Sequence, residues 1–247
     1  MMPLRPPITN HMRCAIVQYN IDPSLYAEPG YNNLHATGAR HVLENKCTKL
    51  VAHYCKKYSI DHHVITKPKI KFRHPTFERF DLWTDTSWTE KYDYVMYMDN
   101  DILVDPDAPN IFDQCKPDAF NTCWYKFRHI DPQILKSQVH DHVLKHIPAE
   151  KLRYRFQSGL FVLNKFSVQA TKRWISKYRM FTVDDGMILN WAILASQVKM
   201  HMMPITFNVK YNTHTKRGFF LHAAGGKKHN PNNFIHWKCD EFLNRIQ

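Results

Sequence analysis

A run of five large apolar residues, Tyr94–Met98, ends abruptly in the triplet Asp99-Asn100-Asp101. A run this short, without polar alternation, is typical of a strand that is covered on both faces, as in a parallel sheet with helices on either side. In open α/β sheets, ligands bind just beyond the carboxyl ends of such strands. The sequence therefore predicts an α/β fold with a binding site where this strand ends.

Two carboxylates separated by one residue suggest a metal site at this position. Asp99 and Asp101 can together hold a hard divalent cation, which prefers carboxylate oxygens and can share its remaining positions with a substrate phosphate. The alternative is a solvated turn, because Asp and Asn both favour turns. The triplet taken alone supports the two interpretations about equally.

The composition favours one packed, soluble domain that covers residues 1–247. The chain is 44% hydrophobic and 13% aromatic, and no segment approaches the roughly 18 consecutive apolar residues of a membrane span. Six cysteines lie far apart without a C-x-x-C pair, so we expect them to be reduced and mostly buried. The first residues lack the apolar core of a secretory signal, which favours a cytoplasmic location, in the producing cell or in a virus-infected host cell.

The net charge of +12 and the pI of about 9.4 predict a surface that attracts anions. Nucleic acid, phosphorylated small molecules, acidic glycans and an anionic membrane face all meet this description. Charge alone does not choose among them.

Apolar periodicity predicts alternating strands and helices along the chain. The expected strands are 14–17, 64–66, 94–98, 120–124 and 156–163, and the expected helices are 43–59, 76–83, 168–178 and 184–195. This alternation points to an open, largely parallel sheet with right-handed crossovers. A helical insertion near an acceptor site is one interpretation of residues 127–151, and we expect an irregular C-terminal region.

Four short motifs follow one another along the chain. They are Asp99-Asn100-Asp101 after a helix that contains Arg79, then Phe156-Gln157-Ser158-Gly159-Leu160, then Asp184-Asp185-Gly186-Met187-Ile188-Leu189-Asn190, and last His222, Gly225 and Lys228 in the spacing His-x-x-Gly-x-x-Lys. Over about residues 13 to 230 their order resembles the GT-A nucleotide-sugar glycosyltransferases, in particular the group of glycogenin and the bacterial lipooligosaccharide galactosyltransferases. The chain departs from that group at Gln157, which replaces an Asn, at Asp185, which replaces a Gln, and at His229-Asn230, which replaces a Pro-Trp pair.

The resemblance implies a single GT-A domain, Rossmann-like, with a mostly parallel central sheet flanked by helices. Residues 13–125 would form the nucleotide-binding half, and residues 126–247 the half that meets the donor sugar and the acceptor. The implied activity is metal-dependent transfer of a sugar, with retention of configuration, from a nucleoside-diphosphate sugar to a glycan, protein or lipid-linked acceptor. A UDP-sugar is favoured over a GDP-sugar, and no nucleic-acid partner is expected.

The resemblance also implies roles for individual residues. The metal ligands would be Asp99, Asp101 and His222, and the imidazole favours Mn²⁺ over Mg²⁺, which is the second choice. Binding of the nucleotide sugar would fall to Gln18, Tyr19, Asn20, Arg79, Asn100, Gly225 and Lys228, with Tyr19 stacking on the base. The catalytic candidates are Gln157, Asp184 and Asp185, where Gln157 lies near the reacting face of the sugar and Asp185 is the general base if the enzyme inverts.

Other classes of function remain open on the sequence. A nucleotidyltransferase that makes a nucleotide sugar shares the sheet and the metal, but it usually carries a Gly-rich basic loop after the first strand, which residues 18–23 lack. A non-enzymatic nucleic-acid-binding protein fits the charge and the interleaved aromatic residues, and it predicts a steep salt dependence of oligonucleotide binding. An inactive homologue that only binds the donor is the third alternative.

Overall fold

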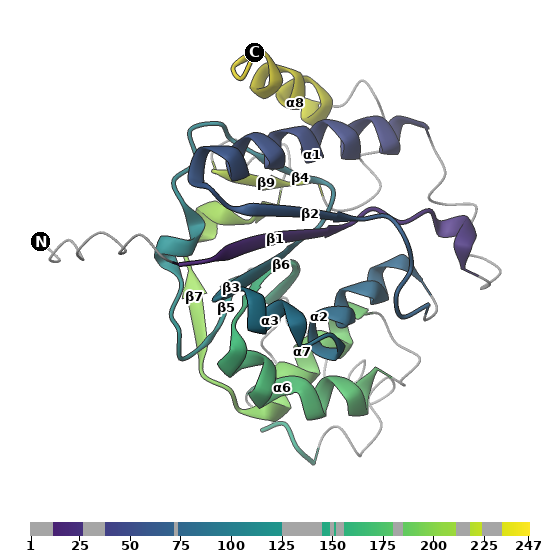
Figure 1. Cartoon of the computed structure of the whole chain (residues 1–247), viewed down its shortest axis with the longest axis vertical. Helices are drawn as coiled ribbons and strands as arrows, with labels where there is room; N and C mark the ends of the chain where they lie inside the picture. The colour runs from purple at the N-terminus through teal and green to yellow at the C-terminus, as the bar shows by residue number, and fades with distance from the viewer. Residues whose placement is uncertain are drawn as a thin grey trace, which may run out of the picture.

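The computed structural model describes residues 12–26, 38–71, 74–124, 145–148, 151, 156–179, 185–210, 218–223 and 234–247. A six-stranded sheet lies at the centre, between helices on its two faces (Figure 1). The order of its strands is β2-β1-β3-β6-β5-β7. Their bounds are Cys14–Tyr19 for β1, Asp61–Ile65 for β2, Tyr94–Met98 for β3, Phe120–Trp124 for β5, Phe156–Leu163 for β6 and Met200–Met203 for β7.

One strand of this sheet, β6, runs against the other five. It pairs antiparallel with β3 and β5, whereas the pairs β1–β2, β1–β3 and β5–β7 are parallel. The mostly parallel sheet is therefore confirmed. Because β6 is reversed, its amino end lies beside the carboxyl ends of β1 and β3, and the Asp99 N–H donates to the Gly159 carbonyl at 2.8 Å.

Helices cover both faces of the sheet. Figure 1 shows α1 (Gly38–Tyr58) and α8 (Phe234–Asn244) on one side, and α2 (Asp81–Thr84), α3 (Ser87–Lys91), α6 (Lys165–Tyr178) and α7 (Asp185–Ser196) on the other. Every residue of β1 and β3 is buried, and successive residues alternate between two cores, with Ile16 packed on the α1 side and Val17 on the α7 side. The expectation of a strand covered on both faces is confirmed.

A smaller sheet brings the end of the chain to the acidic triplet. It contains β4 (Ile102–Val104), β9 (Phe220–His222) and β8 (Val209–Lys210), in the order β4-β9-β8. Strand β4 begins directly after the triplet, and Ile102 pairs with His222. The Ala223 N–H donates to the Asp101 carbonyl at 2.9 Å, so this pairing fixes His222 next to Asp101.

The predicted helices are found with altered ends. Helix α1 ends at Tyr58 and is followed by Ser59 at φ 55°, close to the expected end. Helix α6 begins before the expected residue 168 because Asn164 and Ser167 form a capping box, in which each side chain accepts the other residue's backbone N–H. Helix α7 matches its expected range within one residue at each end.

Two expectations about helices need correction. The segment expected as one helix over 76–83 is a 3₁₀-helix, η2 (Pro75–Phe80), followed by the single turn α2. The expected irregular C-terminus is wrong, because α8 forms there and packs on α1. The insertion expected at 127–151 lies almost entirely outside the described residues. Further 3₁₀-helices are η1 (Pro23–Leu25), η3 (Ile111–Gln114) and η5 (Ile205–Phe207).

The six cysteines are all buried and none forms a disulfide, which confirms the expectation drawn from their spacing. Burial raises the pKa of the Cys55 and Cys123 thiols to about 12, so they are protonated and unreactive at neutral pH. Within the ranges given above, no helix combines the length and the apolar character that crossing a membrane requires.

The fully buried Glu78 anchors η2. Its carboxylate accepts the backbone N–H groups of Lys69, Ile70 and Lys71 at 2.7–2.8 Å and the Tyr26 hydroxyl at 2.8 Å. One side chain thereby ties η2 to the segment before it. The next residue in sequence faces the other way, toward the acidic triplet, because neighbouring helical positions do not share a face.

Replacing this carboxylate should destabilise the protein strongly. In Glu78→Gln, an NH₂ group takes the place of an acceptor that faces backbone donors, and we expect the free energy of unfolding to fall by about 3 kcal/mol. Urea denaturation measures it, with the exposed Glu90→Gln in α3 as the matched control, expected within about 0.5 kcal/mol of the wild type. Equal losses in the two variants would contradict the anchoring role.

Candidate functional site

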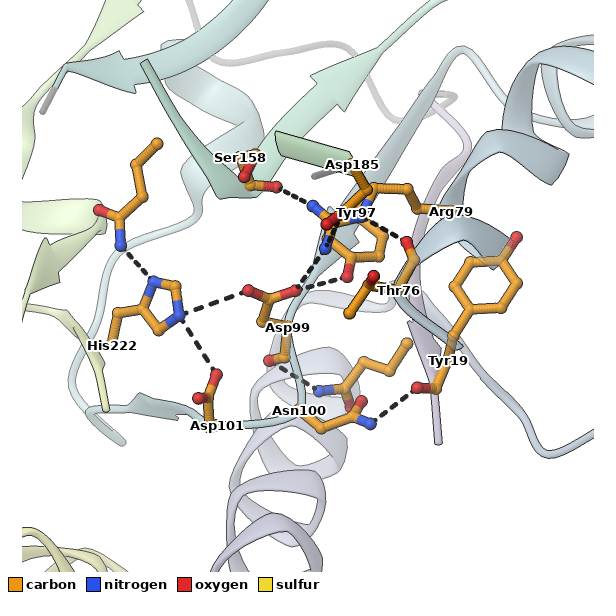
Figure 2. A network of polar contacts seen from close by, with 12 residues as sticks. Tyr19, Thr76, Arg79, Tyr97, Asp99, Asn100, Asp101, Ser158, Asp185 and His222 are labelled. Carbon is orange, nitrogen blue, oxygen red and sulfur yellow. Dashed lines mark hydrogen bonds and ion pairs between the residues drawn. The ribbon is translucent and has the colours of Figure 1, made fainter. Parts of the chain in front are cut away.

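Polar side chains from six separate elements meet at one edge of the sheet (Figure 2). They come from the carboxyl ends of β1 and β3, the amino end of β6, helix η2, the first residue of α7 and the last residue of β9. The reversal of β6 and the pairing of β4 with β9 bring these segments together.

Asp99, Asp101 and His222 form a compact cluster at this edge. The Nε2 atom of His222 lies 3.4 Å from Oδ2 of Asp99 and 3.2 Å from Oδ1 of Asp101. One potential ligand atom from each residue lies within 4.8 Å of the other two. Figure 2 shows the three side chains pointing toward one another. The structure thus brings together all three residues that the sequence proposed as metal ligands.

The charge balance of the cluster favours a cation between the carboxylates. Burial alone would lower the pKa of His222, but Asp101 and then Asp99 raise it to about 9, so the imidazole is protonated at neutral pH. Burial raises the pKa of Asp99, yet the charge of Arg79 and the hydrogen bond from His222 outweigh this effect and keep it below its usual value. Both aspartates therefore face positive groups.

A glycine makes room for this cluster. A Cβ atom at Gly159 would overlap the His222 ring and lie 2.6 Å from Oδ2 of Asp99, too close for any real contact. The site thus requires a residue without a side chain at this position of β6.

Arg79 is buried and bonds to four separate segments. Its Nε donates to the Thr76 carbonyl at 2.9 Å, and Nη1 donates to the Ser158 carbonyl at 2.7 Å. Its Nη2 lies 3.4 Å from Oδ1 of Asp99 and 2.8 Å from Oδ2 of Asp185. All three nitrogens therefore contact protein groups, and the guanidinium joins η2, β3, β6 and α7 at the site.

Tyr97, the last aromatic residue of β3, contacts both the Asp99 carboxylate and the Arg79 guanidinium. The Tyr97 hydroxyl donates to Oδ1 of Asp99, and the guanidinium of Arg79 lies over the Tyr97 ring at 4.4 Å. Burial raises the pKa of Tyr97 well above its usual value, so this hydroxyl remains a neutral donor.

Asn190 explains why α7 begins at the site. Its side-chain oxygen accepts the Phe156 N–H at 2.9 Å, and its amide nitrogen donates to the carbonyls of Phe156 and Gly186, at 3.1 Å and 2.8 Å. The first turn of α7 is thereby joined to the first residue of β6. This contact sets Asp185 opposite Arg79.

The candidates at the end of β1 point mostly into the protein. Gln18 is fully buried, with Oε1 2.9 Å from Nε2 of His62 and Nε2 3.5 Å from the Asp99 carbonyl. The Tyr19 hydroxyl lies 3.3 Å from Oδ2 of the buried Asp81, so its ring belongs to the core. Asn20, by contrast, is only partly buried.

Asn100 links the acidic triplet to β1. Its amide nitrogen donates to the Tyr19 carbonyl at 2.8 Å, while its side-chain oxygen is buried without a hydrogen-bond partner among the described residues. Three further candidates, Asp184, Gly225 and Lys228, lie outside the described residues.

Sequence analysis missed several side chains that shape the site. Tyr97 counted only as part of an apolar run, although a phenol placed two residues before an aspartate can donate to it. Asn190 was quoted in a motif without a role, and His62 was not connected with Gln18. The partners of His62 and Asn190 in neighbouring elements lie far away in the sequence, so only the folded structure reveals them.

Comparison with solved structures identifies the fold. The chain is similar to a glycosyltransferase involved in glycosylation of the major capsid of PBCV-1, with TM-score 0.55 and 12% identity over 94% of this chain and 99% of that one. It is also similar to the galactosyltransferase LgtC in complex with donor and acceptor sugar analogues, with TM-score 0.50 and 13% identity over 94% and 95%. The bifunctional glycosyltransferase WbbM gives TM-score 0.53 and 14% identity over 98% of this chain, which spans 50% of that one.

No protein-family model matches the sequence, and no curated protein matches it. At identities of 12% to 14%, the likeness shows the fold and not the activity. The fold is the GT-A fold of these glycosyltransferases, as the motif order indicated.

Loss of the Arg79 guanidinium should destabilise the folded state. Arg79→Met keeps most of the volume but leaves Asp99 and Asp185 without their shared cation, and breaking a buried pair costs about 3–5 kcal/mol. Urea denaturation compares it with Arg173→Met on the exposed face of α6, expected within about 0.5 kcal/mol of the wild type. Wild-type stability in Arg79→Met would show that Arg79 does not hold the site together.

Proposed function

We propose that this chain is a metal-dependent glycosyltransferase that moves a sugar from a nucleoside-diphosphate sugar to a glycan, protein or lipid-linked acceptor. One observation carries the proposal: Asp99, Asp101 and His222 converge around Gly159, at the sheet edge where α/β folds bind ligands. The GT-A fold adds support, because the similar solved structures are glycosyltransferases.

The donor atoms of the cluster fit a divalent cation. Two carboxylates and an imidazole form a mixed oxygen and nitrogen set, which favours Mn²⁺, with Mg²⁺ as the second choice. The absence of a side chain at Gly159 lets the His222 ring and the Asp99 carboxylate approach each other beside β6. A bound ion would act as a Lewis acid on the diphosphate oxygens, and this effect is worth several kcal/mol in the transition state.

The protein residues then have distinct tasks. Arg79 holds Asp99 and Asp185 in place and adds fixed positive potential where the leaving group gains negative charge. The partly buried Asn20 at the end of β1 and the side-chain oxygen of Asn100 after β3 are the candidates for contact with a nucleotide. Gln18 and Tyr19 hold the end of β1 in place, because their side chains bond to His62 and Asp81 within the protein.

We further propose that residues 13–125 form the nucleotide-binding half and residues 126–247 the half for the donor sugar and the acceptor. Gly225 and Lys228 would contact the diphosphate, and Asp184 would face the donor sugar. The resemblance in motif order favours a UDP-sugar over a GDP-sugar as the donor. We do not expect nucleic acid as a partner.

Retention of configuration is the favoured outcome. An inverting enzyme needs a carboxylate that removes the proton of the acceptor hydroxyl. Asp185 was the candidate for this role, but Arg79 occupies one of its oxygens at 2.8 Å. An engaged carboxylate is a weaker base than a free one, because the adjacent cation favours its charged form.

Release of nucleoside diphosphate tests the proposed activity directly. With UDP-, GDP- and dTDP-sugars and Mn²⁺, we expect slow donor hydrolysis from one UDP-sugar, abolished by EDTA. Asp101→Asn should lower the rate about 100-fold or more, since several kcal/mol of transition-state stabilisation is lost. Asp118→Asn, which removes an exposed aspartate, should keep the wild-type rate. No release and no metal-dependent nucleotide binding would reject the proposal and favour the nucleic-acid alternative.

A substitution at Gly159 should weaken metal binding although none of the proposed metal ligands is replaced. In Gly159→Ala, the methyl group displaces the His222 ring or the Asp99 carboxylate, and we expect Mn²⁺ affinity to fall at least about 10-fold. Electron paramagnetic resonance of free Mn²⁺ reports the affinity. Ser158→Ala in the same strand keeps the backbone carbonyl that Arg79 contacts and should bind Mn²⁺ normally. Equal affinities in the two variants would exclude His222 or Asp99 as a ligand.

A further inference from the structure

Gln157 faces the histidine of the cluster from the side opposite to the aspartates. Its amide nitrogen hydrogen-bonds Nδ1 of His222, while Nε2 of the same ring faces Asp99 and Asp101. Residues 157 and 159 lie on the same face of β6, because side chains alternate along a strand. The ring therefore lies over Gly159 and ends against Gln157.

The two nitrogens of this ring have linked roles. Nε2 faces the carboxylates of Asp99 and Asp101, and its lone pair would face a divalent cation bound by them. A proton on Nδ1 leaves Nε2 available for that cation. The Nδ1–H group then needs an acceptor on the side where Gln157 lies.

Gln157 contains the required acceptor. Its Oε1 is buried and has no hydrogen-bond partner among the described residues. A half-turn of the amide exchanges its oxygen and nitrogen, which have nearly the same shape. With its oxygen turned toward the ring, the amide accepts from Nδ1–H.

We propose that Gln157 is a positioning residue whose Oε1 accepts from Nδ1–H of His222 and thereby holds the ring with Nε2 directed at Asp99, Asp101 and a divalent cation bound between them. The inference rests on the proposed function only in that it assigns the cluster to a metal. It gives Gln157 a role on the metal ligand, whereas the sequence suggested a role at the reacting face of the sugar.

The first test measures Mn²⁺ binding to the metal-stripped full chain without nucleotide, by electron paramagnetic resonance. Gln157→Met removes the acceptor, and we expect the affinity to fall about 10- to 100-fold, the usual effect of losing such a partner. Gln157→Glu offers a carboxylate to Nδ1–H and should bind at least as tightly as the wild type. Gln114→Met, at an exposed position of η3, is the matched control and should not change the affinity.

The second test locates the ring proton by ¹⁵N NMR with Cd²⁺, which is diamagnetic, and with His222→Gln to assign the signals. Cd²⁺ should place the proton of the wild-type ring on Nδ1, protected from exchange by Gln157. In Gln157→Met this signal should broaden through exchange with water. Circular dichroism and the melting temperature establish that each variant is folded.

The outcomes separate this inference from the proposed activity. If Gln157→Met binds Mn²⁺ as the wild type does and only raises KM for a donor sugar, Gln157 is a sugar ligand and the inference is overturned, while the transferase proposal stands. If no nucleotide sugar is used but Mn²⁺ affinity still depends on Gln157 as described, the positioning role holds and the transferase proposal fails. Absence of Mn²⁺ binding in the wild type overturns the inference.

Discussion

Negative charge at the end of a buried strand is the constraint on which this site depends. Asp101 is buried and Asp99 partly so, and a carboxylate in such surroundings is costly unless cations or hydrogen-bond donors face it. The protein supplies Arg79 on one side and His222 on the other. Each comes from a separate element, so the fold is arranged to bring both to β3. The glycine of β6, the anchoring of η2 by Glu78 and the pairing of β4 with β9 all contribute to this arrangement.

Sequence reasoning recovered the parts that local patterns determine. The apolar run 94–98 ended where predicted, because full burial leaves no polar alternation and the aspartates mark the sheet edge. The helices α1, α6 and α7 followed from apolar spacing. The strands β4, β8 and β9 did not, because two or three residues are too few to show a period. Helix η2 was taken for an α-helix, since Phe77 and Phe80 share a face in both forms.

The contacts within the site were harder to foresee. Asp99 and Asp101 were paired through their spacing, and His222 was added to them through a family resemblance. The structure brings the three together. Tyr19 and Gln18 were expected to face a nucleotide, yet each is bonded within the protein, to Asp81 and to His62. A sequence shows which residue types end a strand, but the helices and strands packed beside that strand determine which way their side chains point.

The position of β6 also has a consequence for how the chain folds. β6 enters the sheet between β3 and β5, and it is the strand through which the β2-β1-β3 group and the β5-β7 pair are joined. Until it inserts, β3 and β5 each expose an unpaired, largely apolar edge, the kind of surface on which partly folded chains aggregate. The same strand provides the Gly159 carbonyl that accepts the Asp99 N–H, and the glycine against which the His222 ring lies. A substitution that weakens the pairing of β6 therefore acts on the integrity of the sheet and on the metal-ligand cluster together.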